Sequence, residues 1–369
     1  MSIDRRELLK AGIAVSAATV LPNAGRAEAG FAPRPAAWRA FQVLTRLEIV
    51  KADGNSQAWI PVPAVNESNW FKSLGSTWTS NGRAVLVRAP KYGAEMLHVE
   101  WADGENSPVV EVTSRIATRD RAIDLKKPGR PAPLSAAERD RNTRGTELIP
   151  IDGIVKQTSD QIVANANAET DIEKARAIYE WIVDNTFRDA AVRGCGIGDI
   201  AAMLRTGNLG GKCADLNALY VGLARAAGLP ARDVYGIRVA PSRFDYRSLG
   251  TASAVITEAQ HCRSEVYLAG FGWVPVDAAD VRKVVLEEPP TNLAIEDPKV
   301  VAARKALFGS WETNWLAYNF AHDVALPGSS GPKLGFLMYP QAETASLRLD
   351  CLDPDNFKYT ITAKELTAA

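Results

Sequence analysis

The spacing of apolar residues changes twice along the chain, and this change constrains the fold more than any other feature. From about residue 37 to residue 125, apolar and polar residues alternate in short runs, as in residues 41–49. A period of two is typical of β-strands, and turn clusters such as Asp53-Gly54-Asn55 separate the runs. Several short strands at this spacing predict a β-sandwich-like N-terminal domain over residues 30–125.

From about residue 150 the period becomes helical, and it shortens again later. Thr170 and Glu173 have the spacing of a capping box, and the apolar residues after them predict a helix with one buried face. A second helix is expected after Gly210-Gly211, and Gly228 lies just beyond its end. Helices followed by antiparallel strands are typical of an α+β domain, which we expect over residues 147–285. The strands of this domain are expected at residues 234–239, 262–268 and 272–276.

Two further parts complete the predicted plan. Residues 126–146 begin with Pro128, Pro131 and Pro133 and continue with polar residues, and this composition predicts a linker. Residues 286–369 are expected to form a C-terminal extension with a strand pair near 334–339 and 357–361. An aromatic cluster in this extension is interpreted as core packing, with a carbohydrate or peptide groove as the alternative. The cluster consists of Trp311, Trp315, Tyr318 and Phe320.

The first 29 residues resemble a twin-arginine export signal. The pair Arg5-Arg6 precedes an apolar run of 11 residues at positions 11–21, and Ala27-Glu28-Ala29 has the small residues of a cleavage site. The run is short for a membrane span, which needs about 20 residues. The pattern predicts export of a folded bacterial protein to the periplasm, with no stable membrane span after cleavage. The alternative is a short membrane anchor that is never cleaved.

Charge and composition argue against several classes of protein. The 369 residues include 43 Lys and Arg and 43 Asp and Glu, so the formal net charge is zero. Nucleic-acid-binding domains are usually strongly basic, so no nucleic-acid partner is expected. The chain has only three histidines, none of them at metal-ligand spacing, and it has no C-x-x-C motif, so no metal or cofactor is expected. The four cysteines are too few for a disulfide-built scaffold.

Cys213 is the candidate nucleophile. It follows Gly210-Gly211 at the start of the second predicted helix, where the helix dipole favours the reactive thiolate. A thiolate nucleophile needs a base and the base needs an orienting group. His261 follows 48 residues later and Asp277 another 16 residues later, across an expected hairpin turn that would bring the two side chains together. On spacing alone, a buried structural cysteine near an unrelated histidine is about as plausible.

Two segments resemble the transglutaminase-like superfamily. Residues 210–219, continuing to the Arg-Ala-Ala-Gly-Leu-Pro-Ala-Arg stretch at 225–232, are similar to its nucleophile helix. Residues 261–277 are similar to its histidine-to-aspartate hairpin, and residues 58–63 more weakly resemble an N-terminal β-domain of bacterial members. The resemblance implies a papain-like core in which Cys213 is the nucleophile, His261 the base and Asp277 the orienting group.

The resemblance also implies a reaction. Cys213 would attack a carboxamide or peptide amide and form a thioester, which then passes to water or to an amine. Protein or cell-wall peptide is the expected substrate. Family members usually carry tryptophan at the position of Arg263, so substrate preference is open, and Asp280 competes with Asp277 as the orienting group. A non-catalytic envelope binding module that keeps the fold is the alternative function.

The other cysteines and histidines are expected to have structural roles. Cys262 follows His261 on a strand, so its side chain is expected to face away from the site. Two of Cys195, Cys262 and Cys351 could form a disulfide in an oxidising compartment. His98 and His322 are interpreted as structural or packing residues.

Overall fold

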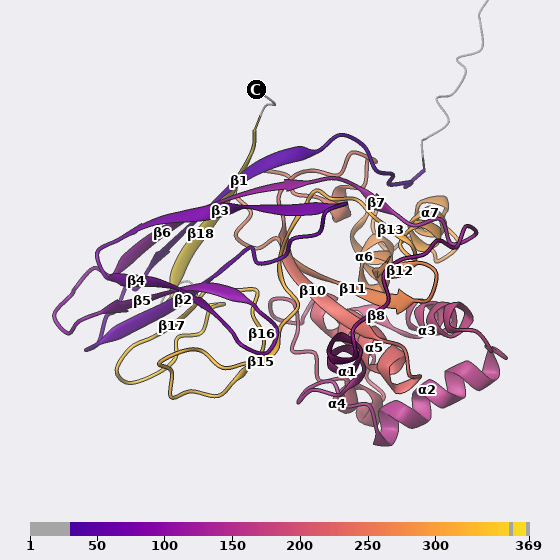
Figure 1. Cartoon of the computed structure of the whole chain (residues 1–369). Coiled ribbons are helices and arrows are strands. Elements are labelled where there is room, and N and C mark those ends of the chain that lie inside the picture. The colour runs from indigo at the N-terminus through magenta and orange to yellow at the C-terminus, as the bar shows by residue number, and fades with distance from the viewer. Residues whose placement is uncertain (1–29, 354–356, 367–369) are drawn as a thin grey trace, which may run out of the picture.

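The computed structural model describes residues 30–353 and 357–366, and the predicted signal at 1–29 lies outside the described residues. These residues form a mixed α/β fold in which an antiparallel sandwich lies beside a helical and sheet-containing core (Figure 1). Within the part of the chain that the structure describes, no helix combines the length and the apolar character that a membrane span requires.

Two four-stranded antiparallel sheets form the sandwich, as the alternating pattern predicts. Their inner faces share one apolar core, in which Leu47 and Val112 of one sheet pack with Ile60 and Leu97 of the other. The first sheet has the order β18 (Lys358–Leu366), β1 (Arg39–Glu48), β6 (Val109–Thr118) and β3 (Phe71–Ser80). The second has the order β17 (Gln341–Glu343), β2 (Ser56–Val62), β5 (Glu95–Trp101) and β4 (Arg83–Arg88).

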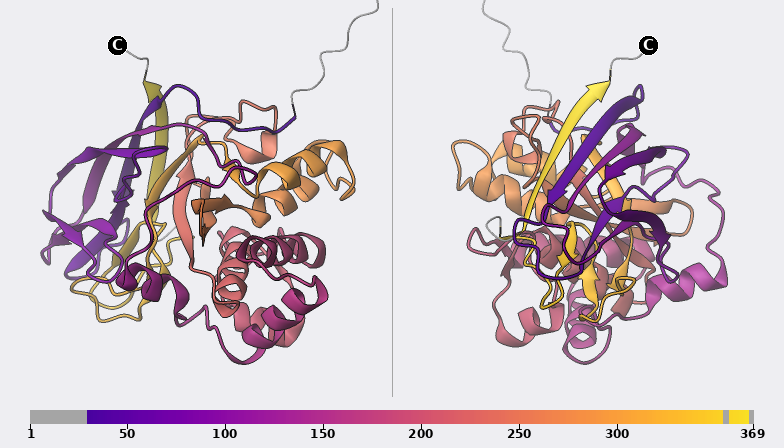
Figure 2. Two further views of the ribbon diagram at one scale, coloured as in Figure 1. Left: turned by 45° about the vertical axis from the view of Figure 1, so that its right-hand side comes forward. Right: turned by 90° about the vertical axis from the view of Figure 1, so that its left-hand side faces the viewer.

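The end of the chain belongs to this sandwich. β18 pairs with β1 from Ala40–Leu366 to Glu48–Lys358, and β17 pairs with β2. Figure 2 shows β18 running beside β1 along one edge of the sandwich. The structure therefore differs from the plan in which residues 286–369 form a separate extension, because backbone pairing joins their last strands to the N-terminal sheets.

The helices gather around the third sheet. Its antiparallel order is β12 (Gly272–Val276), β11 (Gln260–Leu268), β10 (Ala231–Arg238) and β14 (Trp315–Asn319), so the three predicted strands are present. The capping box of Thr170 and Glu173 is confirmed at the start of α3. The helices are α1 (Ala136–Thr143), α2 (Gly153–Asn165), α3 (Asp171–Asn185), α4 (Ile200–Thr206), α5 (Cys213–Ala226), α6 (Ala278–Glu287) and α7 (Pro298–Ala306), with a 3₁₀ turn at Arg247–Leu249.

Three short strand pairs complete the strand pairing of the described residues. Trp311 and Trp315 of the expected aromatic cluster are fully buried against Trp70, Trp315 stacked on its ring and Trp311 edge to face, in agreement with core packing. The predicted linker contains α1, which begins after a capping box of Ser135 and Glu138. The pairs are β7 (Arg121–Ala122) with β13 (Ser310–Trp311), β15 (His322–Val324) with β16 (Leu334–Phe336), and β8 (Phe187–Arg188) parallel to β9 (Gly210–Gly211).

Candidate active site

Cys213 is the first residue of α5 and opens onto a pocket of about 760 Å³. The first N–H groups of a helix have no acceptor within the helix, so they attract negative charge to this position. β9 delivers the chain to α5 in an extended conformation, and Gly211 approaches Asp215 so closely that a Cβ there would lie 2.5 Å from the Asp215 Cβ. A larger residue at position 211 would therefore displace the start of the helix.

Asp215 connects this helix start to the loop that contains Cys195. Its Oδ1 accepts hydrogen bonds from the N–H groups of Ile197 and Gly198, at 2.9 and 2.8 Å, and its Oδ2 accepts one from Lys212 N at 2.9 Å. Gly196 has φ +91°, and a Cβ there would lie 1.8 Å from Asp215 Oδ2. This glycine belongs to the segment Gly194-Cys195-Gly196, to which the sequence alone assigns no role. Its missing side chain allows the backbone to run directly beside the Asp215 carboxylate.

The hairpin of β11 and β12 brings His261 and Asp277 together. Ser264 pairs with Val276, so the same register puts Asp277 opposite Arg263 and diagonal to His261. His261 Nε2 lies 2.8 Å from Asp277 Oδ2 in a hydrogen bond. The carboxylate holds the ring nitrogen Nε2 as the donor, and Nδ1 is then the nitrogen available to Cys213.

Asp277 is itself held from three directions. Its Oδ1 accepts hydrogen bonds from Asn217 Nδ2 at 3.1 Å and from Asp280 N at 3.0 Å. Arg263 Nε lies 3.5 Å from its Oδ2. Asn217 stands four residues after Cys213 on α5, so the helix that begins at Cys213 and the Asp277 carboxylate are directly connected.

The second carboxylate, Asp280, faces His261 at a longer distance. Its Oδ1 lies 3.3 Å from His261 Nε2 and 2.5 Å from Arg238 Nη2. Burial disfavours the imidazolium, but the negative charges of Asp280 and Asp277 outweigh burial and raise the pKa of His261. Burial opposes ionisation of Asp280, yet Arg238 and His261 hold its pKa well below its usual range. Asp277 therefore makes the hydrogen bond, and Asp280 adds charge.

Three thiols meet at the start of α5. Contact with Cys195, then with Cys262 and with His261, lowers the pKa of Cys213 well below its usual range, although burial opposes this. Contact with Cys213, together with burial, raises the pKa of Cys195, and burial raises that of Cys262. Of the three thiols, Cys213 is therefore the one whose surroundings favour the thiolate.

The expected orientation of Cys262 is wrong. Its thiol contacts Cys213, although Cys262 and His261 are neighbours on β11. Asn217 Nδ2 also donates to the Cys262 carbonyl at 2.9 Å, so the start of α5 packs directly against the first residues of β11. All four cysteines are free thiols, so none of the disulfides considered from sequence is present.

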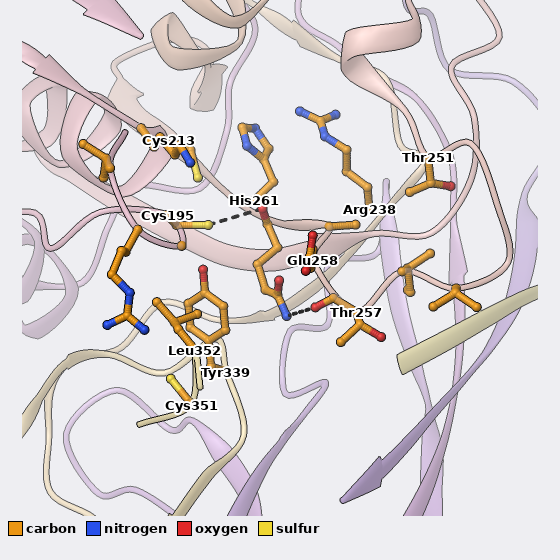
Figure 3. A pocket seen from close by; sticks show the side chains of 18 of the residues that line it. Cys195, Cys213, Arg238, Thr251, Thr257, Glu258, His261, Tyr339, Cys351 and Leu352 are labelled. Atoms are coloured by element: carbon orange, nitrogen blue, oxygen red, sulfur yellow. Dashed lines mark hydrogen bonds between the residues drawn. The ribbon is translucent and has the colours of Figure 1, made fainter. Parts of the chain in front are cut away.

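Residues far away in sequence complete the pocket. Figure 3 shows Cys213, Cys195 and Tyr339 on one side of it, with Thr251, Thr257 and Glu258 on the other. Cys195 Sγ donates to the Gln260 carbonyl at 3.3 Å, and burial, together with contact with Cys195, raises the pKa of Tyr339. Tyr339 precedes β17, and no local pattern in the sequence connects it with Cys213. Cys195, which contacts Tyr339, is marked in the sequence only by the glycines on either side of it, Gly194 and Gly196.

The remaining sequence candidates lie away from Cys213. His98 stacks on Trp59 in the sandwich at a centroid distance of 5.3 Å and bonds to Gln57. His322 is buried on β15 beside Tyr235. Both positions agree with structural roles.

One group of side chains could offer ligands to a metal ion. Ligand atoms of His261, Asp277 and Asp280 lie within 4.8 Å of one another. The guanidinium groups of Arg238 and Arg263 contact the same two carboxylates. Two fixed positive charges in this position oppose a divalent cation, so the arrangement fits a hydrogen-bonded acid–base pair better than a metal centre.

Comparison with known proteins gives a family match in this region. Residues 156–278 match the model of the transglutaminase-like superfamily. A protein of Haemophilus influenzae whose function is uncharacterised is 37% identical over 331 residues, which cover 85% of this chain and 88% of that protein.

The solved structures that match this chain are distant in sequence. A protein from Cytophaga hutchinsonii, provisionally assigned as a cysteine protease, is 15% identical with a TM-score of 0.49, covering 90% of this chain and 99% of that chain. The periplasmic domain of TgpA from Pseudomonas aeruginosa is 14% identical with a TM-score of 0.33, covering 67% of this chain and 88% of that chain.

Proposed function

Since the chain belongs to the transglutaminase-like superfamily, we propose that it is a thiol enzyme that attacks carboxamide or peptide amide bonds with Cys213, His261 and Asp277. The observation that carries the proposal is the 2.8 Å hydrogen bond between His261 and Asp277 beside a thiol whose pKa is lowered. These are the nucleophile, the base and the orienting group that covalent amide cleavage requires.

In the proposed reaction, Cys213 Sγ forms a bond to the amide carbonyl carbon. The carbonyl oxygen gains negative charge, and the N–H of Cys213 at the helix start is in position to donate a hydrogen bond to it. His261 gives its proton to the leaving nitrogen as the carbon–nitrogen bond breaks, and a thioester remains on Cys213. Water, or a second amine, then attacks the thioester with His261 as the base and restores the free thiol.

Asp277 acts through His261. Its carboxylate holds the imidazole ring in one orientation and stabilises the imidazolium that pairs with the Cys213 thiolate. We further propose that protein or cell-wall peptide is the substrate, and that residues 1–29 direct export to the periplasm.

Alkylation of the thiols tests the proposal. Wild-type protein is treated with a small excess of iodoacetamide at pH 6, and mass spectrometry of peptides gives the rate at each of the four cysteines. Cys213 should react at least about ten times faster than Cys351, because its thiolate persists at a pH where an ordinary thiol is protonated. The His261→Ala variant should lose this advantage, and the Cys351→Ala variant, as the matched control, should keep the wild-type alkylation rate at Cys213. Equal rates at Cys213 and Cys351 would overturn the proposed nucleophile.

A second experiment separates the two outcomes of the thioester and the alternative function. A glutamine peptide is incubated with a labelled primary amine, and the product mass distinguishes hydrolysis from transfer. In a cellular assay of the same gene, Cys213→Ala and His261→Ala should abolish the phenotype that the wild-type protein supports. If both variants support it fully, the chain acts as a binding module instead.

A further inference from the structure

The pocket at Cys213 has an uneven charge. Five cations and one carboxylate line it. The carboxylate, Glu258, is exposed to solvent at the rim. The cations are Arg188, Arg193, Lys212, Arg238 and Lys283.

Two of the cations already have a carboxylate partner of their own. Arg238 pairs with Asp280 at 2.5 Å and donates to the Leu249 carbonyl at 2.6 Å. Arg193 pairs with Asp350 at 2.8 Å. Neither pair leaves a surplus charge for a ligand.

The other three cations are less well compensated. Arg188 and Lys283 share one carboxylate, Glu287, with which Arg188 forms an ion pair and from which Lys283 Nζ lies 3.6 Å. The side chains of Arg188 and Lys283 are only 13% and 18% exposed. Among the described residues, no carboxylate lies within ion-pair distance of Lys212, which directly precedes the nucleophile.

The cations also act on one another. Burial and the positive charges of Arg238 and Arg188 lower the pKa of Lys283, and Glu287 only partly offsets them. Like charges repel one another strongly where they are partly shielded from water, and an anion bound among them relieves this repulsion. The three side chains thus form a cationic wall, defined here as Arg188, Lys212 and Lys283.

We propose that the cationic wall selects acyl donors that carry a carboxylate next to the amide that Cys213 attacks. The substrate class is therefore acidic peptide amides, in which the carboxylate comes either from an acidic side chain or from a free C-terminus. This inference rests on the proposed function, because it assigns a specificity to the same nucleophile. The anion binds to the wall while Cys213 reaches the neighbouring carbonyl carbon.

A pair of alkylating reagents tests the wall without any substrate. Iodoacetate and iodoacetamide both transfer a CH₂ carbon to the Cys213 sulfur with loss of iodide, but only iodoacetate is an anion. The ratio of their rates at Cys213 cancels the fraction of thiolate, because both reagents use the same thiolate. The imidazolium of His261 also favours the anion, so the decisive quantity is the change of the ratio in variants of the wall.

The Lys212→Gln and Lys283→Gln variants should each lower the iodoacetate-to-iodoacetamide ratio by roughly 2- to 5-fold at low salt. Added salt should lower the wild-type ratio toward that of the double variant. Lys305→Gln is the matched control, because Lys305 is an exposed lysine of α7 outside the pocket, and its ratio should equal that of wild type. Melting temperatures of all variants confirm that the fold is kept.

Peptide substrates then identify the source of the carboxylate. Hydrolysis or transfer is compared for three peptides that differ only next to the cleaved amide. The neutral reference has glutamine there and an amidated C-terminus. The second peptide has glutamate in place of the glutamine, and the third has a free C-terminus in place of the amidated one. At least one acidic form should have a kcat/KM several-fold above its neutral partner, and Lys283→Gln should remove most of the difference.

The possible failures are distinct. If Cys213 reacts with neither reagent, the proposed function fails and this inference fails with it. If Cys213 reacts with both but the ratio is the same in wild type, Lys212→Gln and Lys283→Gln, only the anionic preference is overturned. Equal kcat/KM for acidic and neutral peptides in a Cys213-dependent reaction has the same consequence.

Discussion

At the scale of single residues, two carboxylates act on His261 in different ways. Asp277 makes the 2.8 Å hydrogen bond, while Asp280 lies 3.3 Å away and is paired with Arg238. Both negative charges raise the pKa of His261 against the effect of burial. The proposed reaction needs a protonated His261 for the leaving nitrogen, so a raised pKa extends the active range toward alkaline pH.

The Asp280→Asn variant tests this effect of charge. Loss of the Asp280 charge removes a contribution that raises the pKa of His261 and leaves Arg238 to repel the imidazolium. The midpoint of the His261 titration should therefore move to lower pH, and the alkaline limb of kcat/KM should move with it. NMR of the ring Cε1–H signals measures the midpoint directly, since the chain has only three histidines.

The control for this measurement is Glu258→Gln, which removes an exposed carboxylate from the rim of the same pocket. Water screens that charge, so the midpoint of His261 should not change. A midpoint in Asp280→Asn that stays in place or rises would show that Asp280 does not act on His261 through its charge.

The sequence predicts some of these residues because their signals are local. The Gly-Gly-x-Cys helix start and the 16-residue interval between His261 and Asp277 across a turn lie within single elements or one hairpin. Cys195 and Tyr339 reach the same pocket from distant segments, and no periodicity connects them with Cys213. Strand alternation correctly separates the side chains of Cys262 and His261, but it does not predict that Cys262 contacts Cys213. That contact depends on where α5 begins relative to β11, which alternation does not encode.

At the scale of elements, β10 buries a carboxylate without the usual partners. Among the described residues, neither oxygen of Asp233 has a hydrogen-bond partner. Burial raises the pKa of Asp233 to about 7, which Arg225 of α5 only partly counteracts. His322 Nε2 of β15 lies 3.4 Å away, but burial and Arg225 lower the pKa of His322 well below its usual range. Below about pH 7 this contact joins two neutral side chains rather than an ion pair.

The Asp233→Asn variant should have a different dependence of stability on pH from wild type. The folded pKa of about 7 lies above the ordinary value of 3.8, so the unfolded chain releases this proton first as the pH rises. Wild type should therefore lose up to about 4 kcal/mol of stability, relative to the variant, between about pH 4 and pH 7. Urea unfolding of both proteins at pH 5 and pH 8 measures the difference.

The comparison isolates Asp233 from its neighbour. The lowered pKa of His322 works in the opposite direction, because stability falls when the pH drops below the ordinary histidine value of 6.5. That contribution is common to wild type and Asp233→Asn, so it cancels in the difference. Parallel pH profiles for the two proteins would mean that the carboxyl is not protonated in the folded state.

Elements with both a cap and an apolar pattern are predicted well, whereas α1, which has a cap but no apolar pattern, is among those missed. The capping box at Thr170 comes with an apolar stripe on α3, and both are present in the structure. α1 has an equally complete capping box at Ser135, but its sequence AAERDRNT has no apolar stripe. The segment therefore looks like a polar linker, although its cap and one buried residue, Asn142, hold a helix.

At the scale of the whole molecule, β18 connects the sandwich with the pocket. It forms the edge next to β1, and Phe357 just before it is buried in the sandwich core. On its other side, Ile256 N donates to Ile361 O at 2.8 Å and Ala363 N donates to Ala254 O at 2.9 Å. Residues around 251–260, together with Phe357 and Tyr359, line the pocket.

This return of the chain could not be predicted from sequence. The partners in the β1–β18 ladder are more than 300 residues apart, from Ala40 with Leu366 to Glu48 with Lys358. Strand pairing depends on register and on the shape of the two faces, and the alternating sequence of a single strand identifies neither. The same alternation near residues 357–361 fits a separate C-terminal extension equally well.

A truncation after Asp353 tests the connection made by β18. It removes the ladder with β1, the buried side chains of Phe357 and Ile361, and two backbone hydrogen bonds to the pocket wall. Loss of the two side chains alone should cost at least about 4 kcal/mol, and the uncovered edge of β1 should promote association. Thermal unfolding and size-exclusion chromatography measure both effects, with a truncation that removes only residues 367–369 as the control.

A milder variant asks whether the connection reaches the site. Ile361 N donates to Thr257 Oγ1 at 2.9 Å, so Thr257→Val removes that acceptor and keeps the shape of the side chain. Because Thr257 lines the pocket, loosening this bond should lower the melting temperature slightly and raise KM, while the rate of Cys213 alkylation by iodoacetamide stays at the wild-type value. No change in KM would mean that β18 stabilises the sandwich without shaping the pocket, whereas a fall in that alkylation rate would mean that the effect extends to Cys213 itself.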